Sequence, residues 1–265
     1  MSSSEYSIYI GNNIDVLRRE VPDNSIQLTV TSPPYDNLRT YNGFKWDFET
    51  VARELFRVTK PGGVVVWVVA DATVKGSETG TSFRHALYFR DVCGFNLHDT
   101  MIYAKTNPIP QTHNRYEQQF EYMFILSKGK PSVFHPLIVA TKHGGKPEEW
   151  GNRRPVAENA ARRRRNGSDT RITSKEKPLY NIWYYSVGGG NAKHPGVFPD
   201  ALARDHILSW SDPGDTVLDP FLGSGMTGEM AVLNGRHFIG CDISPEYVEM
   251  SRARIKQALT FESQP

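Results

Sequence analysis

A proline-rich loop is the first stretch of this chain whose residues could do chemistry. It reads Thr31-Ser-Pro-Pro-Tyr35 and follows directly on the β-branched apolar run of residues 26–30. Proline fixes its own φ and biases the preceding residue towards extended geometry, so the pattern predicts a buried strand that ends in a rigid loop. Such a loop holds a hydroxyl, backbone carbonyls and an aromatic face together, which suits a planar ring that bears an amine. An ordinary Pro-Pro strand end explains the five residues alone equally well.

A second stretch, residues 219–228, carries binding chemistry and reads Asp-Pro-Phe-Leu-Gly-Ser-Gly-Met-Thr-Gly. It follows a predicted strand at 216–218 and leads into a predicted helix that continues to 233. Gly223, Gly225 and Gly228 have the spacing of dinucleotide-binding loops, in which glycine lets a ligand approach the backbone. The next predicted strand, 237–241, is followed by Asp242, an acid placed to hold ribose hydroxyls. The stretch therefore predicts a cleft for a nucleotide-like cofactor.

Alternating strand and helix patterns must position these two loops. Helical patterns cover residues 48–58, 82–92 and 201–210, and strand-like runs cover 6–10, 64–70, 96–105, 122–127 and 180–187. Continuous apolar runs are typical of parallel strands buried on both faces. The alternation therefore predicts an α/β fold with a doubly wound sheet.

The late position of the glycine stretch predicts an unusual strand order. A nucleotide-binding half needs a third strand after Asp242, but only one helix pattern, 245–259, follows it. The strand at 6–10 can supply the missing strand, so the fold is expected to be circularly permuted, with the Pro-Pro strand beside the glycine strand. Ligands of open parallel sheets bind at the carboxyl ends where strand order reverses, so both loops should face one cleft.

Composition narrows the class of protein. The 265 residues include 38% hydrophobic and 23% charged residues, with a net charge of +2, which fits one globular α/β domain with an insertion. No apolar run reaches the roughly 18 residues of a membrane span, and the first residues do not resemble a secretory signal. We therefore expect a cytoplasmic protein with no membrane partner. Cys93 and Cys241 lack CxxC spacing, so we expect neither a metal site nor a disulfide.

Basic residues concentrate where the apolar periodicity disappears, from about 140 to 178. Between Lys142 and Lys177 there are eleven Lys or Arg residues against five Asp or Glu residues. A solvated loop and a phosphate-binding surface both fit this excess. We expect an insertion at 140–178 that divides the domain into parts 1–139 and 179–265.

The Pro-Pro stretch and Asp219-Pro-Phe-Leu-Gly-Ser-Gly225, in that order and with His194-Pro195 and Phe198-Pro199 between them, resemble the β-class of S-adenosylmethionine-dependent DNA amino-methyltransferases. The resemblance covers nearly the whole chain outside 140–178. It implies a Rossmann-like, mostly parallel seven-stranded sheet, with S-adenosylmethionine in the glycine cleft. It also implies double-stranded DNA with a flipped base in the Pro-Pro loop, and target recognition by the basic insertion. A homodimer and a companion restriction endonuclease are further partners that it allows.

The resemblance also implies roles for single residues. In the catalytic loop Ser32, Pro33, Pro34 and Tyr35, the Ser32 side chain and the Pro33 carbonyl accept the two amine protons, which favours a pyramidal nitrogen aimed at the methyl group. Tyr35 stacks on the flipped ring. The cofactor set is Asn12, Thr31, His194, Phe198, Asp219, Phe221, Gly223, Ser224, Gly225, Thr227 and Asp242. The DNA set is Arg153, Arg154, Arg162, Arg163, Arg164 and Arg165.

Several of these residues have plainer explanations that stay open. His194 fits a turn, Phe221 fits the core and Thr227 fits a helix cap. At Asn12 the family often carries aspartate, and an amide oxygen is a weaker acceptor than a carboxylate.

The identity of the base also stays open. Ser32 favours N4 of cytosine, because family members with Ser-Pro-Pro-Tyr are often of that type while Asp-Pro-Pro-Tyr is typical of N6-adenine enzymes. The hydroxyl could serve either base. Methylation at cytosine C5 needs a cysteine nucleophile, and neither Cys93 nor Cys241 follows a proline. A DNA-binding module with a vestigial pocket and a nicotinamide-dependent dehydrogenase are the two alternatives from other classes.

Overall fold

A computed structural model describes residues 4–34, 46–108, 114–142, 144–145, 147–149, 170–172, 174–186 and 199–262. The chain separates into two compact units, a large one formed by Met1–His135 with Asn181–Pro265 and a small one formed by Pro136–Tyr180. The expected insertion at 140–178 falls within the small unit. Its role in target recognition stays a prediction, because the six arginines assigned to it lie outside the described residues.

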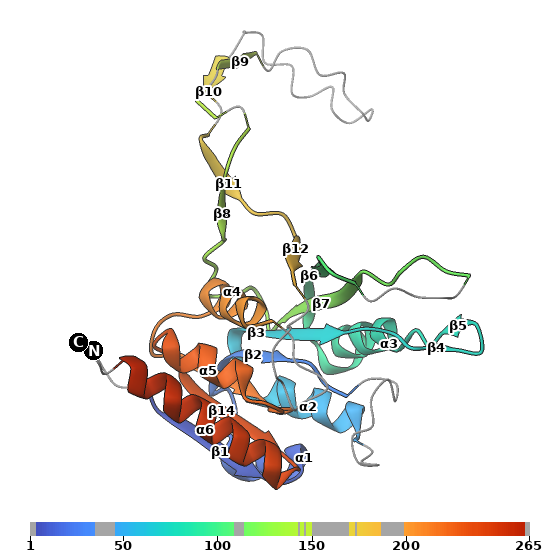
Figure 1. The fold of residues 1–265 in the computed structure, drawn as a ribbon, viewed down its shortest axis with the longest axis vertical. Helices are drawn as coiled ribbons and strands as arrows, with labels where there is room; N and C mark the ends of the chain where they lie inside the picture. Colours follow the sequence, from blue (N-terminus) through green and yellow to red (C-terminus); the bar gives the residue numbers. More distant parts are fainter. Residues whose placement is uncertain are drawn as a thin grey trace. The chain divides into compact units, whose positions relative to one another are not determined.

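An eight-stranded sheet forms the centre of the large unit (Figure 1). Neighbouring strands of this sheet are antiparallel only where β7 (Phe120–Ser127) meets β3 (Thr59–Val69) and β6 (Asn96–Lys105). All other pairs are parallel. The mostly parallel α/β sheet is therefore confirmed. In spatial order the strands are β1 (Tyr6–Ile10), β14 (His237–Asp242), β13 (Thr216–Asp219), β2 (Ile26–Thr31), β3 (Thr59–Val69), β7 (Phe120–Ser127), β6 (Asn96–Lys105) and β12 (Ile182–Tyr185).

The sheet has one strand more than the seven expected. The edge strand β12 lies within the strand-like run predicted at 180–187, is only four residues long and pairs in parallel with β6. Backbone N–H groups of Ile102 and Thr106 donate to the carbonyls of Asn181 and Tyr185 at 2.9 and 3.0 Å. These two bonds, at the residue before the strand and at its last residue, attach it to the sheet edge.

The permuted strand order is confirmed. The N-terminal strand β1 pairs in parallel with β14, from Tyr6 opposite Phe238 to Ile10 opposite Asp242. The Pro-Pro strand β2 lies between the glycine strand β13 and β3. The first strand of the chain thus completes the half of the sheet that the last strands begin.

Helices cover both faces of the sheet. On one face Trp67 of β3 packs with Val51 and Leu55, which belong to the buried side of α2 (Phe48–Val58). On the other face the ring of His206 in α4 (Asp200–Trp210) contacts the sulfur of Met123 in β7 at 3.2 Å. The helices are α1 (Asn13–Glu20), α2 (Phe48–Val58), α3 (Thr81–Tyr88) with the π-turn η1 (Phe89–Cys93), α4 (Asp200–Trp210), α5 (Met226–Leu233) and α6 (Pro245–Glu262).

The small unit contains two antiparallel strand pairs. β8 (Ile138–Ala140) pairs with β11 (Glu176–Pro178), and β9 (Pro147–Glu149) pairs with β10 (Thr170–Ile172). Each strand has three residues and no apolar alternation, so the sequence pattern did not indicate them. A further hairpin in the large unit joins β4 (Thr73–Val74) to β5 (Ser77–Glu78).

No helix in the described part of the chain is long and apolar enough to cross a membrane. Within the same residues, no group of three or more His, Cys, Asp or Glu side chains is placed to bind a metal ion.

Candidate active site

The two predicted loops follow neighbouring strands and leave the sheet at the same edge. The Pro-Pro loop continues β2 after Thr31, and the glycine loop continues β13 after Asp219. Because parallel strands end on the same side, the two loops face a common region. The predicted adjacency of the Pro-Pro strand and the glycine strand is confirmed, and the cleft that both loops were expected to face stays a prediction.

A buried hydrogen bond joins the two loops directly. The Thr31 hydroxyl donates to Oδ1 of Asp219 at 2.7 Å, and both side chains are buried. The same oxygen accepts the backbone N–H of Phe221 at 3.1 Å. From the start of α5, the Thr227 hydroxyl donates to the carbonyl of Val30 at 3.3 Å. These bonds fix the start of the Pro-Pro loop to the start of the glycine loop.

Burial sets the charge of Asp219. Desolvation raises the pKa of this carboxyl to about 6, although the hydrogen bonds from Thr31 and Phe221 act in the opposite direction. At neutral pH the group is therefore mostly a carboxylate. It places a buried negative charge at the start of the glycine loop.

Two glycines of the motif are required by packing between helices. At Gly225, where φ is +81°, an added Cβ would lie 2.7 Å from Cβ of Ser251 in α6. At Gly228 an added Cβ would lie 2.5 Å from the Ile255 side chain. The Ser251 hydroxyl also donates to the carbonyl of Gly223 at 2.9 Å. Close approach of α6 therefore accounts for these glycines, whereas the sequence pattern suggested close approach of a ligand.

Asp242 holds the glycine loop from the end of β14. One carboxylate oxygen accepts the backbone N–H of Gly223 at 2.9 Å, and the other accepts the N–H of Ser244 at 2.9 Å. A carboxylate has about four lone-pair positions, so each oxygen retains acceptor capacity for a hydroxyl. The arrangement is compatible with the predicted ribose contact.

Asn12 lies at the end of β1 and has a structural role of its own. It is the N-cap of α1, and its side-chain oxygen accepts the backbone N–H of Ile14 at 2.9 Å. This bond occupies one lone pair of the oxygen that was predicted to accept the adenine amine. The side chain is exposed, so the second lone pair remains available.

The Pro-Pro loop is held by a tryptophan that the sequence patterns did not single out. Pro33 is buried, while Ser32 and Pro34 are partly exposed. The indole Nε1 of Trp46 donates to the carbonyl of Pro34 at 2.9 Å. Its ring also packs edge-on against Phe221 of the glycine loop, with 4.9 Å between ring centroids. A large aromatic residue directly before the α2 N-cap is the only sequence signal for this contact.

A third acid, Asp71, follows β3 at the same edge and was also missed. Its Oδ1 accepts the backbone N–H of Ser82 at 2.9 Å, and its other oxygen accepts the Ser82 hydroxyl. The N-cap of α3, Gly80, has no side chain to do this. Asp71 therefore caps α3 from a distance, which explains its burial.

The remaining predicted residues divide into two groups. Ser224 and Thr227 are buried in the glycine loop and at the start of α5. Tyr35, His194, Phe198 and the six arginines lie outside the described residues.

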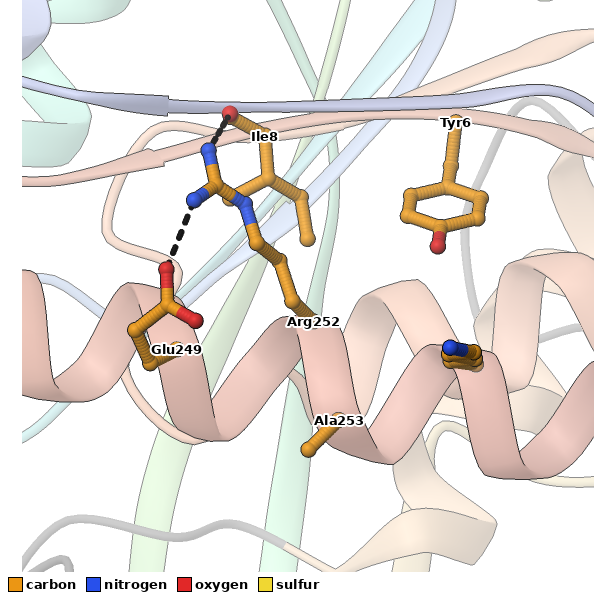
Figure 2. Close-up of a pocket in the computed structure, with 6 residues that line it drawn as sticks. Tyr6, Ile8, Glu249, Arg252 and Ala253 are labelled. Carbon is orange, nitrogen blue, oxygen red and sulfur yellow. Dashed lines mark hydrogen bonds and ion pairs between the residues drawn. The ribbon is translucent and has the colours of Figure 1, made fainter.

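A hollow of about 610 Å³ lies between β1 and α6, away from these loops (Figure 2). Arg252 crosses it, donating to the Ile8 carbonyl at 3.0 Å and pairing with Glu249 at 2.7 Å. None of the predicted site residues lines it. We therefore place the candidate site at the carboxyl edge and not in this hollow.

The fold and the two joined loops define an α/β protein whose candidate binding residues lie at the carboxyl edge of its sheet. A family model described as DNA methylase matches residues 26–253. An orphan methyltransferase of Bacillus amyloliquefaciens, M.BamHII, is 48% identical over 249 residues, which cover 91% of this chain and 92% of that protein. The chain belongs to the N6/N4 family of DNA methylases, and its motif order fits the β-class.

Solved structures agree with this assignment. The putative DNA modification methylase TTHA0409 of Thermus thermophilus, in complex with S-adenosylmethionine, has a TM-score of 0.64 and 26% identity, covering 96% of this chain and 94% of its own. A PvuII DNA methyltransferase described as cytosine-N4-specific has a TM-score of 0.69 and 22% identity, covering 97% and 91%. At that identity the second comparison shows the fold alone.

The protein is thus a DNA amino-methyltransferase with S-adenosylmethionine as its cofactor. The described residues fit a cofactor that carries a nucleoside and a positive charge. Asp242 offers acceptors for ribose hydroxyls, and Asp219 offers a carboxylate for the cationic part. Phe221, two residues after Asp219, adds a partly buried aromatic ring to this set.

Proposed function

We propose that this enzyme transfers a methyl group to the exocyclic N4 of cytosine in duplex DNA. The observation that best supports methyl transfer at this site is the Thr31–Asp219 hydrogen bond, which holds the proposed amine-binding loop against the proposed cofactor loop. The choice of cytosine rests on Ser32. S-adenosylmethionine supplies an activated methyl group. The remaining requirement is that an amine nitrogen be positioned with its lone pair towards that methyl group.

Ser32 and Pro33 are proposed to position the amine. The Ser32 side chain and the Pro33 carbonyl accept its two protons, which withdraws the nitrogen lone pair from conjugation with the ring. Because Pro33 is buried, its φ is fixed by its own ring and its ψ is restricted by the proline that follows it, its carbonyl needs little reorganisation. Most of the rate enhancement then comes from positioning. Pro34 completes the loop, and Tyr35 is proposed to stack on the flipped base.

The cofactor is proposed to contact both ends of the joined loops. Asp242 and Asn12 would bind the nucleoside from the ends of β14 and β1, while Asp219 would attract the positive charge. The other members of the proposed set are Thr31, His194, Phe198, Phe221, Gly223, Ser224, Gly225 and Thr227.

DNA is proposed to bind through the basic insertion. Arginine reads guanine by bidentate hydrogen bonds and also contacts phosphates, so these side chains could serve either role. The set consists of Arg153, Arg154, Arg162, Arg163, Arg164 and Arg165. A homodimer and a companion endonuclease are proposed as further partners. The 48% identical relative is described as an orphan methyltransferase.

Methylation of adenine N6 is the second candidate, because the Ser32 hydroxyl suits both amines. DNA methylated in vitro with isotopically labelled S-adenosylmethionine should be digested to nucleosides and analysed by mass spectrometry. We expect labelled N4-methylcytosine. Labelled N6-methyladenine would establish the second candidate, and label in protein or RNA without label in DNA would exclude both.

A further inference from the structure

One residue outside both motifs contacts both of their loops. The Trp46 indole reaches the Pro-Pro loop through its N–H, which donates to the Pro34 carbonyl at 2.9 Å. It reaches the glycine loop through its ring, whose plane is inclined by 75° to that of Phe221 with centroids 4.9 Å apart. A single side chain therefore couples the position of one loop to that of the other.

The surroundings of Trp46 hold the indole in one orientation. Its ring lies 6.1 Å from the buried ring of Trp67 and 6.0 Å from that of His85, between centroids. The backbone beside it is fixed as well, because Asp47 caps α2 by accepting the N–H of Thr50 at 3.2 Å. Edge-on and tilted aromatic contacts of this kind are directional, so the indole N–H has a defined direction.

The bond to Pro34 matters because of the torsions that it restricts. Proline fixes φ, so ψ is the remaining soft torsion of Pro34. A hydrogen bond to the Pro34 carbonyl restrains that ψ. The bond therefore determines how the partly exposed end of the loop is oriented after the buried Pro33.

We propose that Trp46 is a positioning residue of the methyl-transfer reaction. It holds the Pro33–Pro34 segment in place relative to Phe221, so that the amine nitrogen and the methyl group are aligned. This inference rests on the proposed function of the same site. Trp46 acts through the two loops and needs no contact with substrate.

Trp46→Phe tests the inference, because it removes the indole N–H and keeps an aromatic ring next to Phe221. Trp210→Phe is the matched control. Trp210 is 4% exposed and stacks on Phe134, and its Nε1 has no hydrogen-bond partner among the described residues. Both changes remove the same atoms from a packed indole, but only one removes a bond to a loop.

The kcat of methyl transfer to DNA, the Kd for S-adenosylmethionine by calorimetry and the Tm should be measured for the full chain. We expect Trp46→Phe to lower kcat by about tenfold or more, since small displacements at a reacting centre have such effects, while the Kd stays within about twofold. Trp210→Phe should leave kcat unchanged even if its Tm falls. If Trp46→Phe does not fold, Trp46→Met also has no N–H or O–H donor and should show the same loss.

Equal kcat values for wild type, Trp46→Phe and Trp210→Phe would overturn the inference. A kcat that falls in both variants in proportion to Tm would show a purely structural role and would overturn it as well. A wild-type protein that methylates no DNA would instead refute the proposed function, so the two failures are distinguishable.

Discussion

The hydrogen bond between Thr31 and Asp219 provides a quantitative test of how the two loops are joined. Thr31→Val removes the hydroxyl that donates at 2.7 Å and changes the side-chain volume little. Hydrogen bonds to charged groups contribute roughly 1.5–3 kcal/mol. At pH 8 we therefore expect the free energy of unfolding to fall by about 2 kcal/mol, because a fully buried carboxylate loses a donor.

The same strand offers a matched control. Thr29 lies two residues earlier on β2 and is completely buried, but its hydroxyl has no hydrogen-bond partner among the described residues. Thr29→Val should therefore be neutral or stabilising. Urea denaturation gives the two free energies, and an unchanged m-value would show that the denatured state is not responsible for their difference.

The cost of Thr31→Val should also depend on pH. The Thr31 hydrogen bond stabilises the charged form of Asp219 and therefore lowers the pKa of this carboxyl. Burial has the opposite and larger effect, so the pKa is about 6. In the folded variant the pKa should rise further. The stabilisation from Thr31 is therefore complete at pH values above the pKa of Asp219 in the variant. It decreases as the pH falls from that pKa to the wild-type pKa of about 6. Equal stabilities of the Thr31→Val and Thr29→Val variants at pH 8, or a cost that does not change between pH 8 and pH 5, would refute the reasoning.

Three further predictions concern the catalytic loop, the glycine loop and α4. Ser32→Ala should lower kcat by about 10²-fold without changing the Kd for S-adenosylmethionine, as measured by single-turnover transfer and calorimetry, because it removes one acceptor of the amine. Gly225→Ala should destabilise the protein by about 2 kcal/mol or more in urea, because its Cβ would lie 2.7 Å from Ser251 Cβ at a φ of +81°; Ser251→Gly should restore part of this loss. Burial lowers the pKa of His206 to about 3 in the folded protein. Between about pH 6.5 and 3 this histidine is therefore protonated only in the unfolded state, so the free energy of unfolding should fall as the pH drops through this range. His206→Phe should flatten this acid-side slope in a pH series of urea titrations.

Much of the large unit could be predicted from local pattern. The run at 26–30 predicted β2 because a segment rich in β-branched residues and stopped by Pro-Pro is typical of a buried strand. The helix at 48–58 was predicted at its observed bounds, since its apolar spacing begins after Asp47 and ends at Thr59. Strand order was predictable for a different reason: too little chain follows Asp242 to complete the sheet.

The contacts that build the site could not be predicted in this way. The Thr31–Asp219 bond joins residues 188 positions apart and requires knowledge of the strand neighbours and of the rotamers at their ends. Trp46 belongs to a segment with no periodicity, so only its position in space shows that it reaches Pro34. The glycine spacing was recognised, but the packing of α6 that requires Gly225 depends on how two helices meet.

Circular permutation explains why cross-links of this kind are needed. In this chain the proposed amine-binding loop and the proposed cofactor loop come from opposite ends of the sequence, and no short connection holds them together. Methyl transfer depends on the alignment of an amine nitrogen with a methyl group, and small displacements are costly. The adjacency of β2 and β13 fixes the spacing of the loops to that of neighbouring strands. The hydroxyls of Thr31 and Thr227 fix the starts of the two loops through their bonds to Asp219 and to the Val30 carbonyl. Trp46 connects the loops further along, at Pro34 and Phe221. The two loops are therefore joined both at their starts and beyond them, and should move as one unit.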